Sequence, residues 1–371
     1  MALLERLVLA SFASPGGLTR LELEELTGLS RTVVAGVVAS LVARGDLVET
    51  REPPTRGVRG RPPARFRRAA LLPPVLMIEL ERGGATAVSS VCGDGTRSQI
   101  LECVSWSAPW HAWSGSVADA AGLLTARLQA PPRLAVVSAP FPVADGQGAP
   151  RLHEVPAEDL AMMGKRMPPR SPWLEKDPRP ALSDRLGCTA LLMNDANLAA
   201  LGEARFGAGR GRRAVVHVSV VGGIGAGFVV EGQLFTGAHG FCGELAHVQV
   251  TPGGSACMCG NRGCLATEAR LTGHACEDQT ELGSLVGRAL APLATALDPD
   301  CVVVDARLAD EAAPFMAGVT SELARRCPAQ VAENLAVVAG ELEDARRFGA
   351  LAAADAHAAA LVSQSAWPAL S

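Results

Sequence analysis

Four side chains that can bind metal lie within one short stretch of this chain, and they constrain its fold more than any other feature. His247 precedes the segment Cys257-Met258-Cys259-Gly260-Asn261-Arg262-Gly263-Cys264. Three thiolates and an imidazole form the closed tetrahedral set of structural zinc sites, and glycines let a short loop wrap an ion. Chance clustering of reduced thiols is the alternative. The other cysteines are scattered, unlike a disulfide framework. The sequence therefore predicts one structural zinc per chain, held by His247, Cys257, Cys259 and Cys264.

Charge divides the chain into a basic head and an acidic body. Its 371 residues exceed what one compact core usually holds, so we expect two or three units. Residues 1–70 contain 11 arginines and 7 acidic residues, a net charge of +4, while the remainder has 23 basic and 31 acidic residues, a net charge of −8. This asymmetry is expected when only the head contacts a polyanion.

The sequence lacks a long apolar run and an export signal, so we expect a cytoplasmic protein that does not contact membranes.

Three short helical patterns occupy the head. A segment at residues 21–26 is followed by a glycine turn, and Ser30 can cap a third helix that ends near Arg44. This is the layout of a helix-turn-helix, whose second helix enters the major groove with its N-terminal residues on the base edges. We therefore place Ser30, Arg31 and Thr32 at a DNA interface, with Arg31 and Thr32 as the residues that read bases.

An arginine-rich loop follows, between two expected short strands at residues 47–50 and 65–67. Its arginines include Arg56, Arg59 and Arg61. Guanidinium groups on such a loop can lie along phosphates or in a minor groove, as on the wing of a winged helix. A solvated linker is the alternative, but the preceding helix-turn-helix pattern favours contact with DNA.

From Pro73 onward, β-rich apolar segments alternate with helical ones, which predicts an α/β body. The expected strands cover residues 75–80, 85–91, 134–138, 191–193, 215–221, 225–231 and 301–305. Asn194-Asp195-Ala196-Asn197 directly follows one strand, and Gly243-Glu244-Leu245-Ala246-His247 lies downstream. A carboxylate beside amides can hold a sugar hydroxyl or accept its proton. An Asn-Asp pair after a strand is, however, more often a turn or a helix cap.

Together these segments resemble the ROK family of repressors, open reading frames and kinases. The resemblance spans nearly the whole chain and rests on residues 194–211, 222–227, 237–247 and the cysteine loop. It implies a two-lobed body with an actin-like, ribonuclease-H-like ATPase fold behind an α+β winged helix-turn-helix domain, assembled as a homodimer or homotetramer. We expect the DNA-binding domain at residues 1–70, a first lobe at 75–190, and a second lobe at 191–371 that holds the zinc loop. The C-terminal helix is expected to return to the first lobe.

The resemblance also implies roles for single residues. The positions of Asn194, Asp195, Glu244 and His247 contact the sugar in family members that bind one, and the aspartate is the base in the kinases. His247 would then serve both the effector pocket and the zinc. By the same resemblance, the metal shapes the pocket and does no chemistry.

Three departures from the family's kinases stand out. Their Asp-x-Gly-Gly-Thr phosphate loop is degenerate here, at residues 78–84, with Glu81 at a glycine position where its charge would repel phosphates. A Leu-Gly-Gly segment on the adenosine side is replaced by residues 303–307, whose side chains would fill nucleotide space. A sugar-binding glutamate is replaced by Ala266, and Glu268 could substitute only if the loop shifts. We therefore expect no ATP and no kinase activity.

The sequence thus favours a DNA-binding transcriptional regulator that acts by default as a repressor. Its partners would be a double-stranded DNA operator and a sugar or sugar derivative as effector. Two other functions remain open: an active sugar kinase that uses Asp195 as its base, and a regulator whose body binds a protein partner.

Overall fold

The computed structural model describes residues 2–12, 17–43, 47–50, 64–68, 74–93, 95–128, 131–143, 173, 177–220, 223–257, 259–271, 278–305 and 312–365. The chain divides into two compact units. One comprises residues 1–73 with 92–96, and the larger one comprises residues 74–91 and 97–371. The boundary that we expect between two lobes, near residue 190, remains a prediction.

The N-terminal unit combines three helices with a small antiparallel sheet. The helices are α1 (Ala2–Ser11), α2 (Arg20–Thr27) and α3 (Arg31–Ala43). The strands, in spatial order, are β1 (Leu18–Thr19), β3 (Arg65–Arg68) and β2 (Leu47–Thr50). Val34 and Val38 of α3 are buried in one cluster with Leu23 and Phe66. The apolar periodicity predicted the helices and two of the strands, whereas β1 is too short for an alternating pattern.

The connection between α2 and α3 has a local cause at each end. Thr19 and Glu22 form a capping box, in which the Glu22 N–H donates to the Thr19 hydroxyl at 3.2 Å and the Thr19 N–H donates to the Glu22 carboxylate at 2.6 Å. Gly28 ends α2 with a φ of 66°, in the left-handed region that favours glycine. The bend between α2 and α3 is 115°. Roughly 90–120° across a short turn with glycine is the geometry of a helix-turn-helix.

The same two helices are relevant to membrane insertion. Within the part of the chain that the structure describes, no single helix is long and apolar enough to cross a membrane. Only α2 and α3 taken together reach that length and composition, and the 115° bend separates them.

The larger unit contains two sheets with the same topology. The first has the order β6-β5-β4-β7-β8 and the second β11-β10-β9-β12-β13. In each, the first three strands along the chain form an antiparallel meander, and the last two extend it in parallel. The first sheet comprises β4 (Val75–Leu80), β5 (Thr86–Val91), β6 (Leu101–Cys103), β7 (Leu134–Ala139) and β8 (Thr189–Asn194). The second comprises β9 (Ala214–Ser219), β10 (Gly225–Val230), β11 (Gln233–Leu234), β12 (Cys301–Val304) and β13 (Ala336–Ala339).

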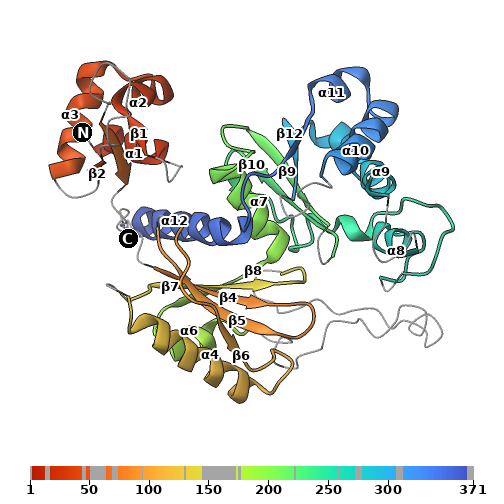
Figure 1. The fold of residues 1–371 in the computed structure, drawn as a ribbon, viewed down its shortest axis with the longest axis horizontal. Helices are drawn as coiled ribbons and strands as arrows, with labels where there is room; N and C mark the ends of the chain where they lie inside the picture. The colour runs from red at the N-terminus through yellow and green to blue at the C-terminus, as the bar shows by residue number, and fades with distance from the viewer. Residues whose placement is uncertain are drawn as a thin grey trace, which may run out of the picture. The chain divides into compact units, whose positions relative to one another are not determined.

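Helices cover both faces of each sheet (Figure 1). On the outer faces, α4 (Trp110–Thr125) and α6 (Arg179–Leu186) pack on the first sheet, and α9 (Gln279–Leu297) and α10 (Ala312–Arg326) pack on the second. Between the sheets, α7 (Asp195–Phe206) packs on β9 and β10, and α12 (Ala345–Ser365) packs on β4 and β7. The short helices η2 (Leu245–His247), α8 (Leu265–Leu271) and α11 (Ala329–Asn334) complete the described helices of the second half. The alternating pattern predicted this α/β body.

Two glycines allow α7 and α12 to pack backbone against backbone. A Cβ at Gly202 would overlap the carbonyl oxygen of Ala345, and a Cβ at Gly349 would overlap the carbonyl oxygen of Leu198. The neighbouring Glu203 is fully buried, and its carboxylate accepts the N–H groups of Ala208 at 2.8 Å and Leu342 at 2.9 Å. The crossing therefore also holds the segment that leads into α12.

We expect Gly202→Ala to destabilise the larger unit by about 2 kcal/mol, because overpacking a tight contact typically costs about 1–3 kcal/mol. Urea unfolding followed by tryptophan fluorescence measures the effect. Gly122→Ala is the matched control, since Gly122 lies in α4 with open space around its missing Cβ. That substitution should be neutral or stabilise by up to about 1 kcal/mol. Equal stability of Gly202→Ala and the parent would show that the crossing is not tight.

Candidate functional site

The four predicted metal ligands come together in the structure. Their ligand atoms all lie within 4.8 Å of one another. The Sγ of Cys257 lies 3.5 Å from Nδ1 of His247, and the Sγ of Cys259 lies 3.6 Å from the Sγ of Cys264. A tetrahedral zinc with sulfurs at about 2.3 Å holds two sulfurs about 3.7 Å apart. The cluster therefore fits one tetrahedral metal ion, with Nδ1 of His247 as the nitrogen ligand.

Local backbone geometry explains why the cysteine loop closes. Two isolated bridges hold it, Gln249 with Cys264 and Ala256 with Arg262. Gly263 has a φ of 70°, and a Cβ there would overlap the carbonyl oxygen of Thr251. Only glycine fits this position without strain.

Glu268 supports the same loop from α8. Its Oε1 accepts the N–H of Ser255 at 3.0 Å and lies 2.5 Å from the position of a Cβ at Gly254. The sequence alone allowed Glu268 to replace the missing sugar-binding glutamate if the loop shifted. In the structure, its carboxylate is instead used to brace the loop.

The thiols of the cluster titrate very differently. Burial raises the pKa of Cys257, but hydrogen bonds, chiefly with His247 and the backbone of Cys259, outweigh it and lower the pKa to about 6. Burial and the adjacent thiols raise the pKa of Cys264. One thiolate therefore forms readily, whereas a second beside it is costly without a cation. A divalent metal would offset that repulsion and let the sulfurs ionise together.

We expect about one divalent metal ion per chain in the purified protein, lost in Cys257→Ser because a hydroxyl is a poorer ligand than a thiolate. Elemental analysis of the dialysed protein measures it. Cys188→Ala, which removes a half-buried thiol outside the cluster, should keep the metal. Full metal content in Cys257→Ser would rule out the proposed ligand set.

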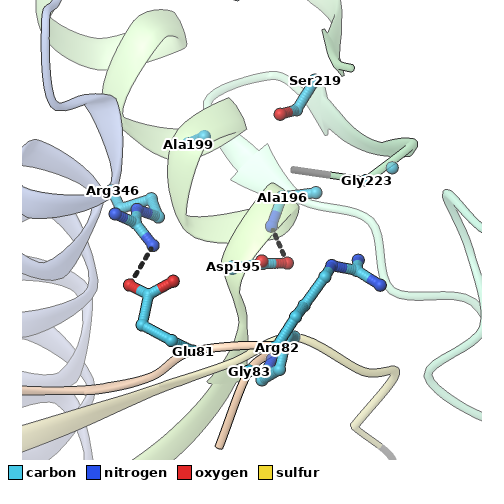
Figure 2. A pocket seen from close by; sticks show the side chains of 11 residues that line it. Glu81, Arg82, Gly83, Asp195, Ala196, Ala199, Ser219, Gly223 and Arg346 are labelled. Atoms are coloured by element: carbon cyan, nitrogen blue, oxygen red, sulfur yellow. Dashed lines mark hydrogen bonds and ion pairs between the residues drawn. The ribbon is translucent and has the colours of Figure 1, made fainter. Parts of the chain in front are cut away.

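The larger unit also contains an open cleft of about 220 Å³. Residues of five regions line it: the loop after β4, the residue after β7, the N-terminal half of α7, the ends of β9 and β10, and the first turn of α12. They are Glu81, Arg82, Gly83, Pro140, Asp195, Ala196, Ala199, Ser219, Gly223, Gly225 and Arg346. Figure 2 shows Asp195 in the middle of this lining, with Arg82 on one side and the Glu81–Arg346 pair on the other.

Asn194 and Asp195 both lie at the start of α7, but their side chains make different hydrogen bonds. The Asn194 Oδ1 accepts the N–H of Asn197 at 3.0 Å, and its Nδ2 donates to the carbonyl of Phe141 at 3.1 Å. Asn194 is thus a helix cap, the alternative that the sequence left open. The Asp195 Oδ1 accepts the N–H of Ala196 at 2.8 Å, and the residue lines the cleft.

Glu244 lies close enough to His247, Arg82 and Asp195 to interact with their charges. Burial raises the pKa of Glu244, the charges of His247 and Arg82 lower it, and that of Asp195 raises it, with a net upward shift. Two of the other predicted effector residues therefore act on Glu244, together with Arg82, a side chain that the sequence did not select. Effector contact by Asn194, Asp195, Glu244 and His247 remains a prediction.

The degenerate phosphate loop forms an ion-pair network. Glu79 is buried and pairs with Arg97 and Arg346, the latter at 3.2 Å. Arg346 also lies 3.6 Å from Glu81. The negative charge expected to repel phosphates is therefore balanced by an arginine from the far end of the chain. No sequence signal links Arg346 to this loop, because nearly all of the larger unit separates the two.

The strand end predicted to face adenosine is also filled by side chains. Asp305 is buried after β12, and its Oδ2 accepts the hydroxyl of Ser219 at 2.7 Å. Ser219 lines the cleft.

The predicted DNA-reading residues lie where α3 begins. Ser30, Arg31 and Thr32 are all exposed, and the carbonyl of Ser30 accepts the first helical N–H, from Val34, at 3.0 Å. The wing arginines Arg56, Arg59 and Arg61 lie outside the described residues.

Comparison with known proteins gives a family match and two curated relatives. Residues 166–282 match the model of the ROK family. The chain is 48% identical over 91 residues to a glucokinase of Thermotoga maritima, covering 24% of this chain and 29% of that protein. It is 35% identical over 96 residues to the xylose repressor of Bacillus subtilis, covering 26% and 25%. These matches span between a quarter and a third of the relatives' length.

A solved structure extends the likeness to nearly the whole chain. It is a ROK family transcriptional regulator, a homologue of the E. coli MLC protein. It superposes with a TM-score of 0.65 at 18% identity, covering 94% of this chain and 96% of the other. The fold is thus the two-lobed, actin-like α/β fold of ROK regulators and kinases, as predicted. The chain contains a ROK family domain.

Proposed function

We propose that this protein is a DNA-binding transcriptional regulator whose ROK body senses a small molecule. The observation that carries the proposal is the N-terminal unit. Its α2 and α3 cross a glycine turn at 115°, a small sheet follows, and Arg31 and Thr32 are exposed where α3 begins. In a winged helix, these side chains face base edges. Ser30 and the wing arginines Arg56, Arg59 and Arg61 add phosphate contacts.

The body is proposed to have lost kinase function. Phosphoryl transfer depends on positioned phosphates and electrostatic stabilisation. Here the side chains of Glu81 and Arg82 project from the stretch where family kinases have glycines, and the Arg82 guanidinium lies against Gly223. Backbone N–H groups that would cradle phosphates are thereby obstructed. Asp195 and Glu244 then serve to hold an effector.

The metal cluster is proposed to bind one structural zinc. A closed set of three cysteines and one histidine leaves no open position for a substrate. Because His247 is near both the metal and Glu244, the metal would shape the effector site. The regulator is proposed to act in the cytoplasm as a homodimer or homotetramer that represses by default, with the effector changing the spacing of two DNA-binding units.

An active sugar kinase is the second candidate, because glucokinases are among the relatives and Asp195 occupies the position of the family's base. We expect no ADP release above background when the protein is incubated with ATP and a panel of hexoses. A coupled assay on the parent and on Asp195→Asn measures it. Turnover that Asp195→Asn abolishes would establish the kinase instead.

DNA binding is tested with fragments selected from genomic DNA by the full-length protein. We expect Arg31→Ala to weaken binding to a selected fragment by about tenfold or more, since a good base contact contributes about 1–3 kcal/mol. Fluorescence anisotropy at several salt concentrations measures it, and parent affinity should fall steeply with salt.

The matched control is Arg133→Ala, an exposed arginine of the body that should leave affinity unchanged. Absence of salt-sensitive binding by the parent protein would refute the regulator proposal.

A further inference from the structure

Arg82 is a cation of the cleft that makes no hydrogen bond or ion pair with any residue that the structure describes. It is exposed, and its guanidinium packs against Gly223 across the cleft. Arg346, the other arginine of the lining, is by contrast engaged with Glu79 at 3.2 Å, Glu81 at 3.6 Å and Asp344 at 3.9 Å. The guanidinium of Arg82 is therefore available to a ligand, whereas that of Arg346 is already neutralised.

Carboxyl groups stand opposite this cation. Asp195 lines the same cleft (Figure 2), and Glu244 is close enough to feel the charges of both Arg82 and Asp195. Carboxylates are good acceptors for hydroxyl groups, and a guanidinium presents a planar fork of donors that matches a carboxylate or a phosphate. The cleft thus presents a guanidinium that can bind an anion and a carboxylate that can bind hydroxyl groups, within about 220 Å³.

We propose that the cleft binds a small carbohydrate with an anionic substituent, a phosphate monoester or a carboxylate. Arg82 holds the anionic group, while Asp195 accepts hydrogen bonds from the hydroxyls. A neutral sugar would cover the guanidinium without pairing it, which costs binding free energy. The inference rests on the proposed effector-sensing function of the body, and it names the chemical class of the effector.

A tryptophan next to Arg82 provides a direct readout. The Trp106 Nε1 donates to the carbonyl of Glu81 at 2.8 Å, and the Trp173 Nε1 donates to the carbonyl of Trp106 at 3.1 Å. Trp173 in turn stacks on Trp113 with ring centroids 4.3 Å apart. These side chains include three of the five tryptophans of the chain. Movement of the Arg82 loop on binding should therefore change the intrinsic fluorescence.

The test titrates the full-length protein with matched ligands: neutral hexoses, their 6-phosphates, the corresponding hexuronates, and inorganic phosphate alone. We expect one anionic class to bind at least about tenfold more tightly than its neutral parent, because charge-assisted hydrogen bonds are the stronger ones. Tightest binding by the 6-phosphates or by the hexuronates identifies which anion the cleft takes. Affinity should decrease as ionic strength rises.

Arg82→Gln is the decisive variant. It should bind the anionic sugar no better than the neutral one, with a nearly unchanged melting temperature in the absence of ligand, since Arg82 makes no hydrogen bond or ion pair with the described residues. Arg133→Gln, which removes an exposed arginine of the same unit outside the cleft, should keep the preference. Retained preference in Arg82→Gln, equal binding of neutral and anionic sugars by the parent, or no binding of any of these ligands would overturn the inference.

DNA affinity of the same preparations, measured by anisotropy, separates this inference from the proposed function. If the parent protein binds DNA but shows no preference for anionic sugars, only the proposed effector class is refuted. Absent DNA binding refutes the regulator itself.

Discussion

The close crossing of α7 and α12 is the constraint on which the rest of the larger unit depends. Glycines at positions 202 and 349 let the two backbones meet between the sheets, where any Cβ would collide with a carbonyl. The first turn of α7 carries Asp195, and the first turn of α12 carries Arg346. The crossing therefore determines how the carboxylate of Asp195, which follows the first sheet, and the guanidinium of Arg346, near the end of the chain, are placed around one cleft.

The cleft shows how charged side chains line a fold that is shared with kinases. Glu79, Glu81 and Arg346 form ion pairs in the stretch where the kinases have a glycine-rich phosphate loop, and Asp305 with Ser219 fills the end of the neighbouring strands. Buried ion pairs stay stable only when the charges remain paired. The network thus occupies Arg346 and leaves Arg82 and Asp195 facing the cleft.

The metal cluster and the carboxyl group of Glu244 are linked through one residue. His247 directs Nδ1 toward Cys257, and its charge also acts on Glu244. Glu268 and Gly263 also hold the loop in place. A metal in the cluster would fix the ring of His247 and so limit where Glu244 can lie, since the partners of a ligating histidine set its orientation.

The sequence by itself determined the local features: the helices and main strands, the metal-ligand set and the glycine positions. Each depends on residues that are close along the chain, through periodicity, capping or turn geometry. It also indicated Asp195 and Glu244 as a cluster and left open the role of Asn194 as a helix cap, which the structure shows. Only the tertiary structure decided the ion pairs of Glu79 and Glu81 with Arg346, and the exposure of Arg82 to the cleft. These pairings join residues separated by more than 250 positions, and such contacts form only where the packing of sheets and helices brings the two segments together.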